Sequence, residues 1–126
     1  MDPYADDDAK RRKRNFFGFN PGIQGWILLS KEGLPINSAL PRDVNDSIVS
    51  AMSAAILSVS ERAVKELTRG NLKRILIEGA EGIIILSKAG PNYILCTLVK
   101  SDASQGMLLH YFNNKPPKMK DAVYVE

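Results

Sequence analysis

Few residues of this 126-residue chain have side chains that could bind a metal or act as a nucleophile. His110 is the only histidine and Cys96 is the only cysteine. A zinc site draws about four ligands from Cys, His and carboxylates at short spacings, so we expect no metal site here. The single cysteine excludes an internal disulfide. Because Cys96 lies in an apolar run, we expect it to be a small packing residue, and we expect His110 to be a partly exposed residue of a C-terminal helix.

The carboxylates and glycines also show no catalytic pattern. Glu61 and Glu66 are five residues apart, and Glu78 and Glu81 flank a turn, so neither pair predicts an acid–base couple. The chain contains no glycine-rich phosphate loop that ends in Lys followed by Ser or Thr. We therefore expect a protein that is not an enzyme and that has no cofactor.

The basic residues are densest near the N-terminus. Three aspartates at residues 6–8 precede a run of five cations, Lys10, Arg11, Arg12, Lys13 and Arg14. Such runs are usually solvated tails. The functional alternative is contact with an anionic membrane surface or with nucleic-acid phosphates. Because the rest of the chain is nearly neutral, we expect no specific nucleic-acid binding.

Length and composition predict one soluble, cytoplasmic domain. The chain is 44% hydrophobic, which is enough for a single core. No apolar run approaches the ~20 residues of a membrane span, and the N-terminus is charged where a signal peptide would be apolar. We expect residues 1–22 to form a charged arm and aromatic connector, residues 23–114 the domain, and residues 115–126 a tail.

The longest predicted element is a helix over residues 43–69. Asp43 is the predicted N-cap, and Gly70-Asn71 supplies a left-handed stop. Apolar residues recur at three- and four-residue spacing, and this stripe is expected to cover a sheet. The stripe consists of Ile48, Met52, Ala55, Ile56, Val59, Ala63 and Leu67.

Five strands surround this helix in the sequence. Two precede it, and Pro35 predicts that the second lies at a sheet edge. The three later strands are apolar at consecutive positions, which indicates that both sheet faces are covered. The expected strands are residues 26–30, 35–40, 73–78, 83–87 and 93–100, followed by an amphipathic helix over residues 104–113.

A single chain offers little to cover both faces, so we expect a second subunit. The helix also carries small residues that allow another helix or sheet to approach closely. They equally well allow the helix to lie tightly on its own sheet. These residues are Ala51, Ser53, Ala54, Ala55 and Ser58.

The segments 25–36, 69–78 and 82–86, together with the order of the elements, resemble the roadblock/dynein light chain family. The resemblance implies an α+β fold with the order β-β-α-β-β-β-α. Its five-stranded antiparallel sheet has the order 2-1-5-4-3, with the long helix on one face and a short C-terminal helix. It also implies that two copies join through the third strand and the long helix into a continuous sheet. The implied dimer interface contains Met52, Ile56, Val59, Ala63, Ile75, Leu76 and Ile77.

The resemblance further implies a non-enzymatic homodimeric scaffold that binds and modulates a Ras-like small GTPase. Charged residues outside the apolar stripe are the candidates for docking it, and ordinary solvation with an Arg62–Glu66 pair is the alternative. The candidates are Arg62, Lys65, Glu66 and Arg69. The chain departs from the family at residues 8–19, where members usually carry an amphipathic helix.

Two other functions remain open at this point. A small-molecule sensor of the PAS or profilin-like kind would need a sizeable pocket within one subunit. An adaptor would bind an anionic membrane or a nucleic acid through the basic arm, with steep salt dependence.

Overall fold

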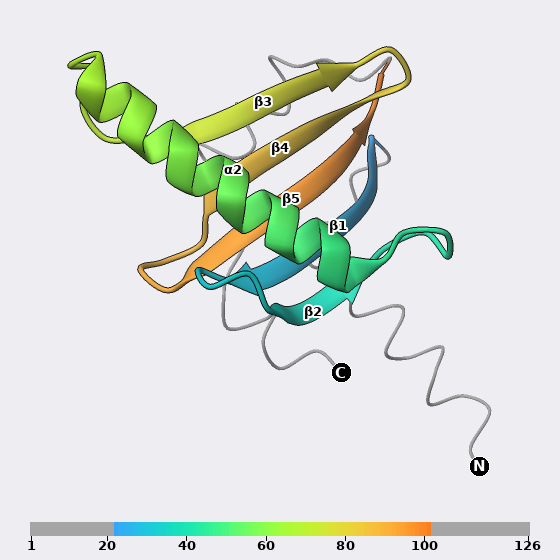
Figure 1. The fold of residues 1–126 in the computed structure, drawn as a ribbon. Helices are drawn as coiled ribbons and strands as arrows, with labels where there is room; N and C mark the ends of the chain where they lie inside the picture. Colours follow the sequence, from blue (N-terminus) through green and yellow to red (C-terminus); the bar gives the residue numbers. More distant parts are fainter. Residues whose placement is uncertain (1–21, 102–126) are drawn as a thin grey trace.

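The computed structural model describes residues 22–101, which form one antiparallel sheet and one helix (Figure 1). The expected C-terminal helix, His110, the basic arm and most of the aromatic connector lie outside the described residues. The elements are β1 (Ile23–Ser30), β2 (Pro35–Ala39), α2 (Asp46–Glu66), β3 (Arg74–Gly79), β4 (Gly82–Lys88) and β5 (Tyr93–Lys100).

The strand order is β2-β1-β5-β4-β3, as expected from the resemblance. β5 lies in the centre because it pairs with both β1 and β4. Pro35 opens the edge strand β2, as predicted, since proline has no N–H for the ladder. The β1–β2 pairing also contains an irregularity between Leu28 and Leu29. The other edge strand, β3, pairs regularly with β4 along its whole length.

Two turns at one end of the sheet are joined by the backbone. In the β1–β2 turn, Gly33 has a φ of 94° and its N–H donates to the carbonyl of Ser30 at 2.9 Å. The N–H of Lys31 donates to the carbonyl of Asn92 in the β4–β5 turn at 3.0 Å. A Cβ at Gly33 would lie 3.3 Å from Cα of Ala51, so glycine also allows α2 to approach this turn.

The helix begins at Asp46, three residues later than predicted, and Asn45 rather than Asp43 is the N-cap. Asn45 has extended backbone angles, and its Oδ1 accepts a hydrogen bond from the N–H of Ile48 at 3.1 Å. The N–H of Val44 donates to the carbonyl of Pro41, which holds Asp43 in the preceding turn. Both residue types suit an N-cap, and this turn decides between them.

The helix also ends earlier than predicted, at Glu66. Thr68 already has a positive φ of 53°, so the left-handed turn comes before Gly70, where φ is 85°. The backbone N–H of Arg69 reaches back to the carbonyl of Val64 at 2.7 Å. This bond satisfies a carbonyl of the last turn that the helix itself leaves open.

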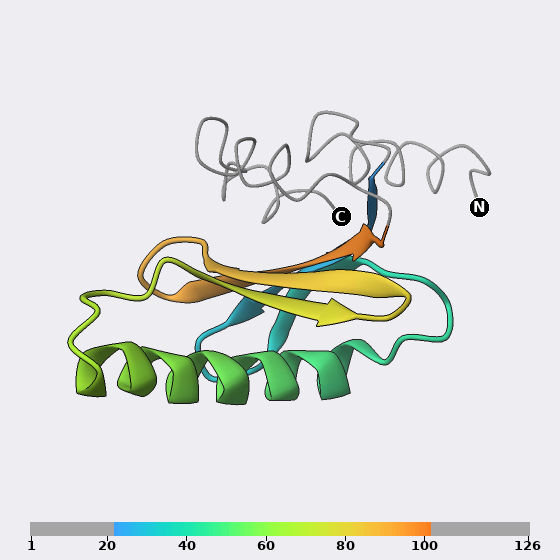
Figure 2. The ribbon, with the colours of Figure 1, turned by 90° about the horizontal axis from the view of Figure 1, so that it is seen from above.

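One face of the sheet packs against α2, which lies along it as a second layer (Figure 2). The helix packs chiefly against β1, β2 and β5. Cys96 is 1% exposed in this core, which confirms the packing role expected for it. The buried cluster consists of Ile27, Leu29, Leu57, Leu86, Ile94 and Cys96.

The sheet face directed away from α2 is also apolar and buried. Trp26, Leu28 and Leu95 form one cluster on this face, and Ile83, Ile85 and Val99 form another. All six are at most 5% exposed within the single chain. The expectation that both faces are covered is therefore correct, and these two faces of the sheet give no reason to expect a second subunit.

The uncovered apolar surface lies on α2 instead, so the predicted direction of its stripe is wrong. The residues of α2 that are buried against the sheet are Ser50, Ser53 and Leu57. Four large side chains of the predicted stripe point to solvent in the single chain. These are Ile48, 58% exposed, Met52, 56%, Val59, 71%, and Leu67, 67%. Small residues let the helix lie close to the sheet, and this leaves the larger side chains outside.

The 21 residues of α2 are also long and apolar enough, by length and composition alone, to cross a membrane. This corrects the expectation that no segment of the chain reaches that length. The criterion is weak evidence for a span, because core helices of soluble proteins also meet it. In this structure α2 contributes three residues to the core of a sheet domain.

Candidate functional site

The first candidate surface is the exposed apolar stripe of α2, which we define as Ile48, Met52, Val59 and Leu67. Ala63 is exposed beside the stripe, and Ile56 is half-buried against the core. Exposed apolar surfaces of this kind are typical of sites at which proteins contact another molecule. The stripe belongs to the same element that the resemblance assigned to a dimer interface.

The three interface candidates on β3 divide between the two faces of that strand. Ile75 packs against the core beneath α2, and Ile77, two residues on, shares its face. Leu76 points to the opposite face and packs against Ile83, Ile85 and Val99. A partner that covered α2 would therefore meet Ile75 and Ile77, whereas Leu76 could contribute only through its backbone.

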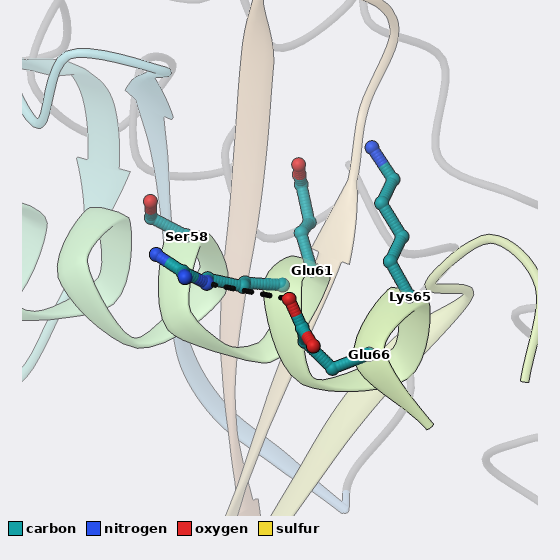
Figure 3. A pocket seen from close by; sticks show the side chains of 5 residues that line it. Ser58, Glu61, Lys65 and Glu66 are labelled. Atoms are coloured by element: carbon teal, nitrogen blue, oxygen red, sulfur yellow. Dashed lines mark ion pairs between the residues drawn. The ribbon is translucent and has the colours of Figure 1, made fainter. Parts of the chain in front are cut away.

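The second candidate surface is a charged flank of α2, made of Ser58, Glu61, Arg62, Lys65 and Glu66. These residues line an open depression of about 490 Å³, and Ser58, Glu61 and Lys65 rise from the same side of the helix (Figure 3). Arg62 Nε lies 3.9 Å from Glu66 Oε1, which confirms the expected pair. Both side chains are largely exposed, so this pair contributes little to stability.

The structure brings together three of the four docking candidates, Arg62, Lys65 and Glu66, on this flank. The fourth, Arg69, lies in the turn after the helix and does not line the depression. The five cations at residues 10–14 lie outside the described residues. The charged flank is therefore the part of the predicted docking site whose geometry the structure gives.

A cleft adjoins the charged flank and shares Ser58 and Glu61 with it. It measures about 460 Å³ and lies between α2, the β1–β2 turn and the β4–β5 turn. Lys88 Nζ lies 3.1 Å from Glu61 Oε1 and links β4 to the helix across it. Sequence reasoning missed Lys31, in the β1–β2 turn, and Lys88, at the end of β4, because no local pattern signals that these two segments meet.

The structure places the potential metal ligands and the single cysteine of residues 22–101. Among residues 22–101, no three His, Cys, Asp or Glu side chains are grouped so that they could hold a metal ion. Burial raises the pKa of the Cys96 thiol above its ordinary value of 9.0, and a hydrogen bond with Ser53 opposes part of that rise. The thiol is therefore protonated near neutral pH, and a protonated, buried thiol is a poor nucleophile.

Comparison with known proteins gives consistent results at the levels of sequence and structure. The sequence model described as the Roadblock/LC7 domain matches residues 17–99. An uncharacterized protein from Methanocaldococcus jannaschii, MJ0310, is 32% identical over 99 residues, which cover 79% of this chain and 86% of that protein.

Solved structures share the fold at lower sequence identity. A Roadblock/LC7 domain from Streptomyces avermitilis is 19% identical, with a TM-score of 0.71 over 82% of this chain and 88% of that one. The gliding protein mglB from Thermus thermophilus is 11% identical, with a TM-score of 0.72 over 94% of this chain and 88% of that one. At these identities the structural likeness shows the fold alone.

Proposed function

The chain belongs to the Roadblock/LC7 domain family, and from this premise we propose that it is a non-enzymatic homodimeric scaffold that binds and modulates a Ras-like small GTPase. The single observation that carries the proposal is the placement of two different surfaces on α2. Ser58, Glu61 and Lys65 of the charged flank point away from the apolar stripe, whereas Arg62 and Glu66 lie at its border. One surface suits a second copy of the chain, and the other remains accessible to a partner.

The apolar stripe supports the dimer. Its four large side chains are each more than half exposed in one copy, and a symmetric partner would cover them with the same residues. The sheet edges favour the same arrangement. β2 opens with Pro35 and pairs irregularly, whereas β3 is a regular strand of six residues without proline. Of the two edges, β3 is therefore the better one to continue into a second sheet.

The charged flank supports docking of the GTPase. Arg62 and Glu66 are 84% and 70% exposed and hold each other only at 3.9 Å, so a partner can replace this weak pair at little cost. We place Lys65 and Arg69 in the same contact because they lie near the same end of α2. Charge reversals there should leave the fold intact, since no core residue belongs to this flank.

Any effect on hydrolysis would come from positioning the groups of the GTPase itself. This chain has no phosphate loop, and its described residues supply neither a metal site nor a nucleophile poised for reaction. The small-molecule sensor receives less support, because the two depressions described above are open to solvent. From the same family membership we also propose that the protein acts in the cytoplasm.

A capture experiment tests this proposal. The tagged full chain is incubated with cytosol of its own organism, supplied with either GDP or a non-hydrolysable GTP analogue, and retained proteins are identified. We expect a Ras-like GTPase to be retained in a nucleotide-dependent manner, and less of it by Lys65→Glu. GTP hydrolysis by the pure chain, abolished by a point substitution in it, would overturn the scaffold role.

A further inference from the structure

The charges of the described residues are segregated along the strand direction. One end carries seven cations and three carboxylates, a net charge of +4. The other carries two cations and four carboxylates, a net charge of −2. The first group is Lys31, Arg62, Lys65, Arg69, Lys73, Arg74 and Lys88 with Glu32, Glu61 and Glu66. The second group is Arg42 and Lys100 with Asp43, Asp46, Glu78 and Glu81.

The cleft between α2 and the two turns opens at the cationic end. Its apolar lining comes from Ala54 and Leu57 of the helix and from Pro91 and Ile94 on the opposite side. Its charged rim comes from Lys31, Glu32, Glu61 and Lys88. A volume of about 460 Å³ accommodates one large side chain together with part of the backbone that carries it.

The walls of the cleft are held in place before any partner binds. The hydrogen bond from Lys31 N–H to the Asn92 carbonyl joins the two turns, and the N–H of Ala89 donates to the carbonyl of Tyr93 at 3.0 Å. Gly33 packs against the helix on the same side. A preformed cleft costs little ordering on binding.

The cleft lies on a different side of α2 from the surface assigned to the dimer. Ala54, Ser58 and Glu61 line it, whereas Met52 and Val59 belong to the exposed stripe. A second copy seated on the stripe would leave the cleft accessible.

The chemistry of the rim distinguishes between anionic partners. A membrane or a nucleic acid presents negative charge uniformly, and the carboxylates of Glu32 and Glu61 would oppose it. An acidic protein segment can place a carboxylate beside Lys31, keep its other charges away from the two glutamates, and insert an apolar side chain between the walls of the cleft. The rim itself is neutral, since it has two lysines and two glutamates and Lys88 is paired with Glu61, so the complementary charge comes from the surrounding end of the domain, whose net charge is +4. An apolar lining within that cationic end is complementary to such a segment.

We propose that this cleft receives an aromatic or large aliphatic side chain from an acidic segment of a protein partner. The inference deepens the proposed function, because it gives the chemistry of a partner that docks at the charged flank. It rests on that proposal only in treating the flank as a docking surface. It does not require the partner to be a GTPase.

Amide NMR spectra of the full chain, recorded during titration with capped hexapeptides, test the proposal without any GTPase. The acidic probe is Asp-Glu-Phe-Leu-Glu-Asp. One control replaces Phe-Leu by Gly-Gly, and a second is the basic peptide Lys-Arg-Phe-Leu-Lys-Arg. We expect shifts at Lys31, Ser58 and the residues of 88–94 other than Pro91 with the acidic probe, and much smaller shifts with both controls.

Matched charge reversals complete the test. Lys31→Glu should weaken binding of the acidic probe about fivefold, the upper range for an exposed ion pair, whereas Lys100→Glu at the opposite end should change it less than about twofold. No shifts at about 2 mM peptide, equal shifts with the basic peptide, or shifts confined to the apolar stripe would each overturn the proposal. A failure to bind a GTPase, with the peptide shifts as expected, would contradict the proposed function and support the assignment of this cleft.

Discussion

Substitution of Val59 by glutamate tests whether the exposed stripe of α2 joins two copies of the chain. Val59 is 71% exposed in the single chain, the largest value on the stripe. A glutamate there should not disturb the core, because the helix uses Ser50, Ser53 and Leu57 to contact the sheet. The variant is therefore expected to remain folded and to lose the ability to dimerise.

The size of the effect follows from the exposed fraction of Val59. Complete burial of a valine side chain is worth about 1.5–3 kcal/mol, so covering the exposed 71% contributes about 1–2 kcal/mol per copy. A two-fold interface includes the residue twice, which gives about 2–4 kcal/mol. Loss of this energy alone raises the Kd of the dimer roughly 30- to 1000-fold. Burial of the unpaired carboxylates adds to the loss.

Light scattering of the eluting protein at micromolar concentration measures the mass, and far-UV circular dichroism measures the fold. Ser58→Glu is the matched control, because it adds the same charge one residue away on the exposed charged flank. The wild type and the control should show twice the chain mass of 13.9 kDa, and Val59→Glu should show a single copy. A monomeric wild type, or a Val59→Glu variant with unchanged mass, would refute the reasoning.

Three further predictions concern stability. Gly33→Ala should lower the Tm more than Gly70→Ala. Both glycines have a positive φ, but of the two only Gly33 has neighbours 3.3 Å from an added Cβ. Equal decreases in Tm in thermal melts would contradict this contact. Ser50→Ala should leave the free energy of unfolding unchanged or raise it by up to about 1 kcal/mol, because the buried Ser50 Oγ has no hydrogen-bond partner. A clear decrease in this free energy, measured by denaturant titration, would show that Ser50 Oγ has a partner. Burial raises the pKa of the Cys96 thiol, so its contribution to stability is complete below the unfolded value of 9.0 and is lost as the pH rises above that value. The unfolding free energy of Cys96→Ala should therefore fall less steeply from pH 8 to 10 than that of the wild type, and parallel curves would exclude this contribution.

The strands could be predicted from sequence because their apolar runs leave little choice. Residues 93–100 form the central strand β5 at the predicted bounds, and Pro35 placed β2 at an edge. The choice of Asn45 over Asp43 as N-cap depends on the turn at Pro41 and Val44. Either side chain can cap a helix, so composition alone does not separate them.

The direction of the helix could not be predicted from hydrophobic periodicity, because the sheet side of α2 includes Ser50 and Ser53. Periodicity counts serine as polar and assigns the larger apolar residues to the core. The close contact of Gly33 with Ala51 and Ala54 reverses that assignment. Likewise, the cleft depends on the hydrogen bond between Lys31 and Asn92, which are about sixty residues apart in the sequence.

The mass of the complex with a GTPase tests the central claim most directly. The purified chain is mixed with the captured GTPase in its preferred nucleotide state, and light scattering gives the mass of the complex as it elutes. The account predicts a complex with two copies of this 13.9 kDa chain and at least one GTPase, and a complex that is lost with Arg62→Glu combined with Lys65→Glu. A complex with one copy of the chain, or none at tens of micromolar protein, would contradict it.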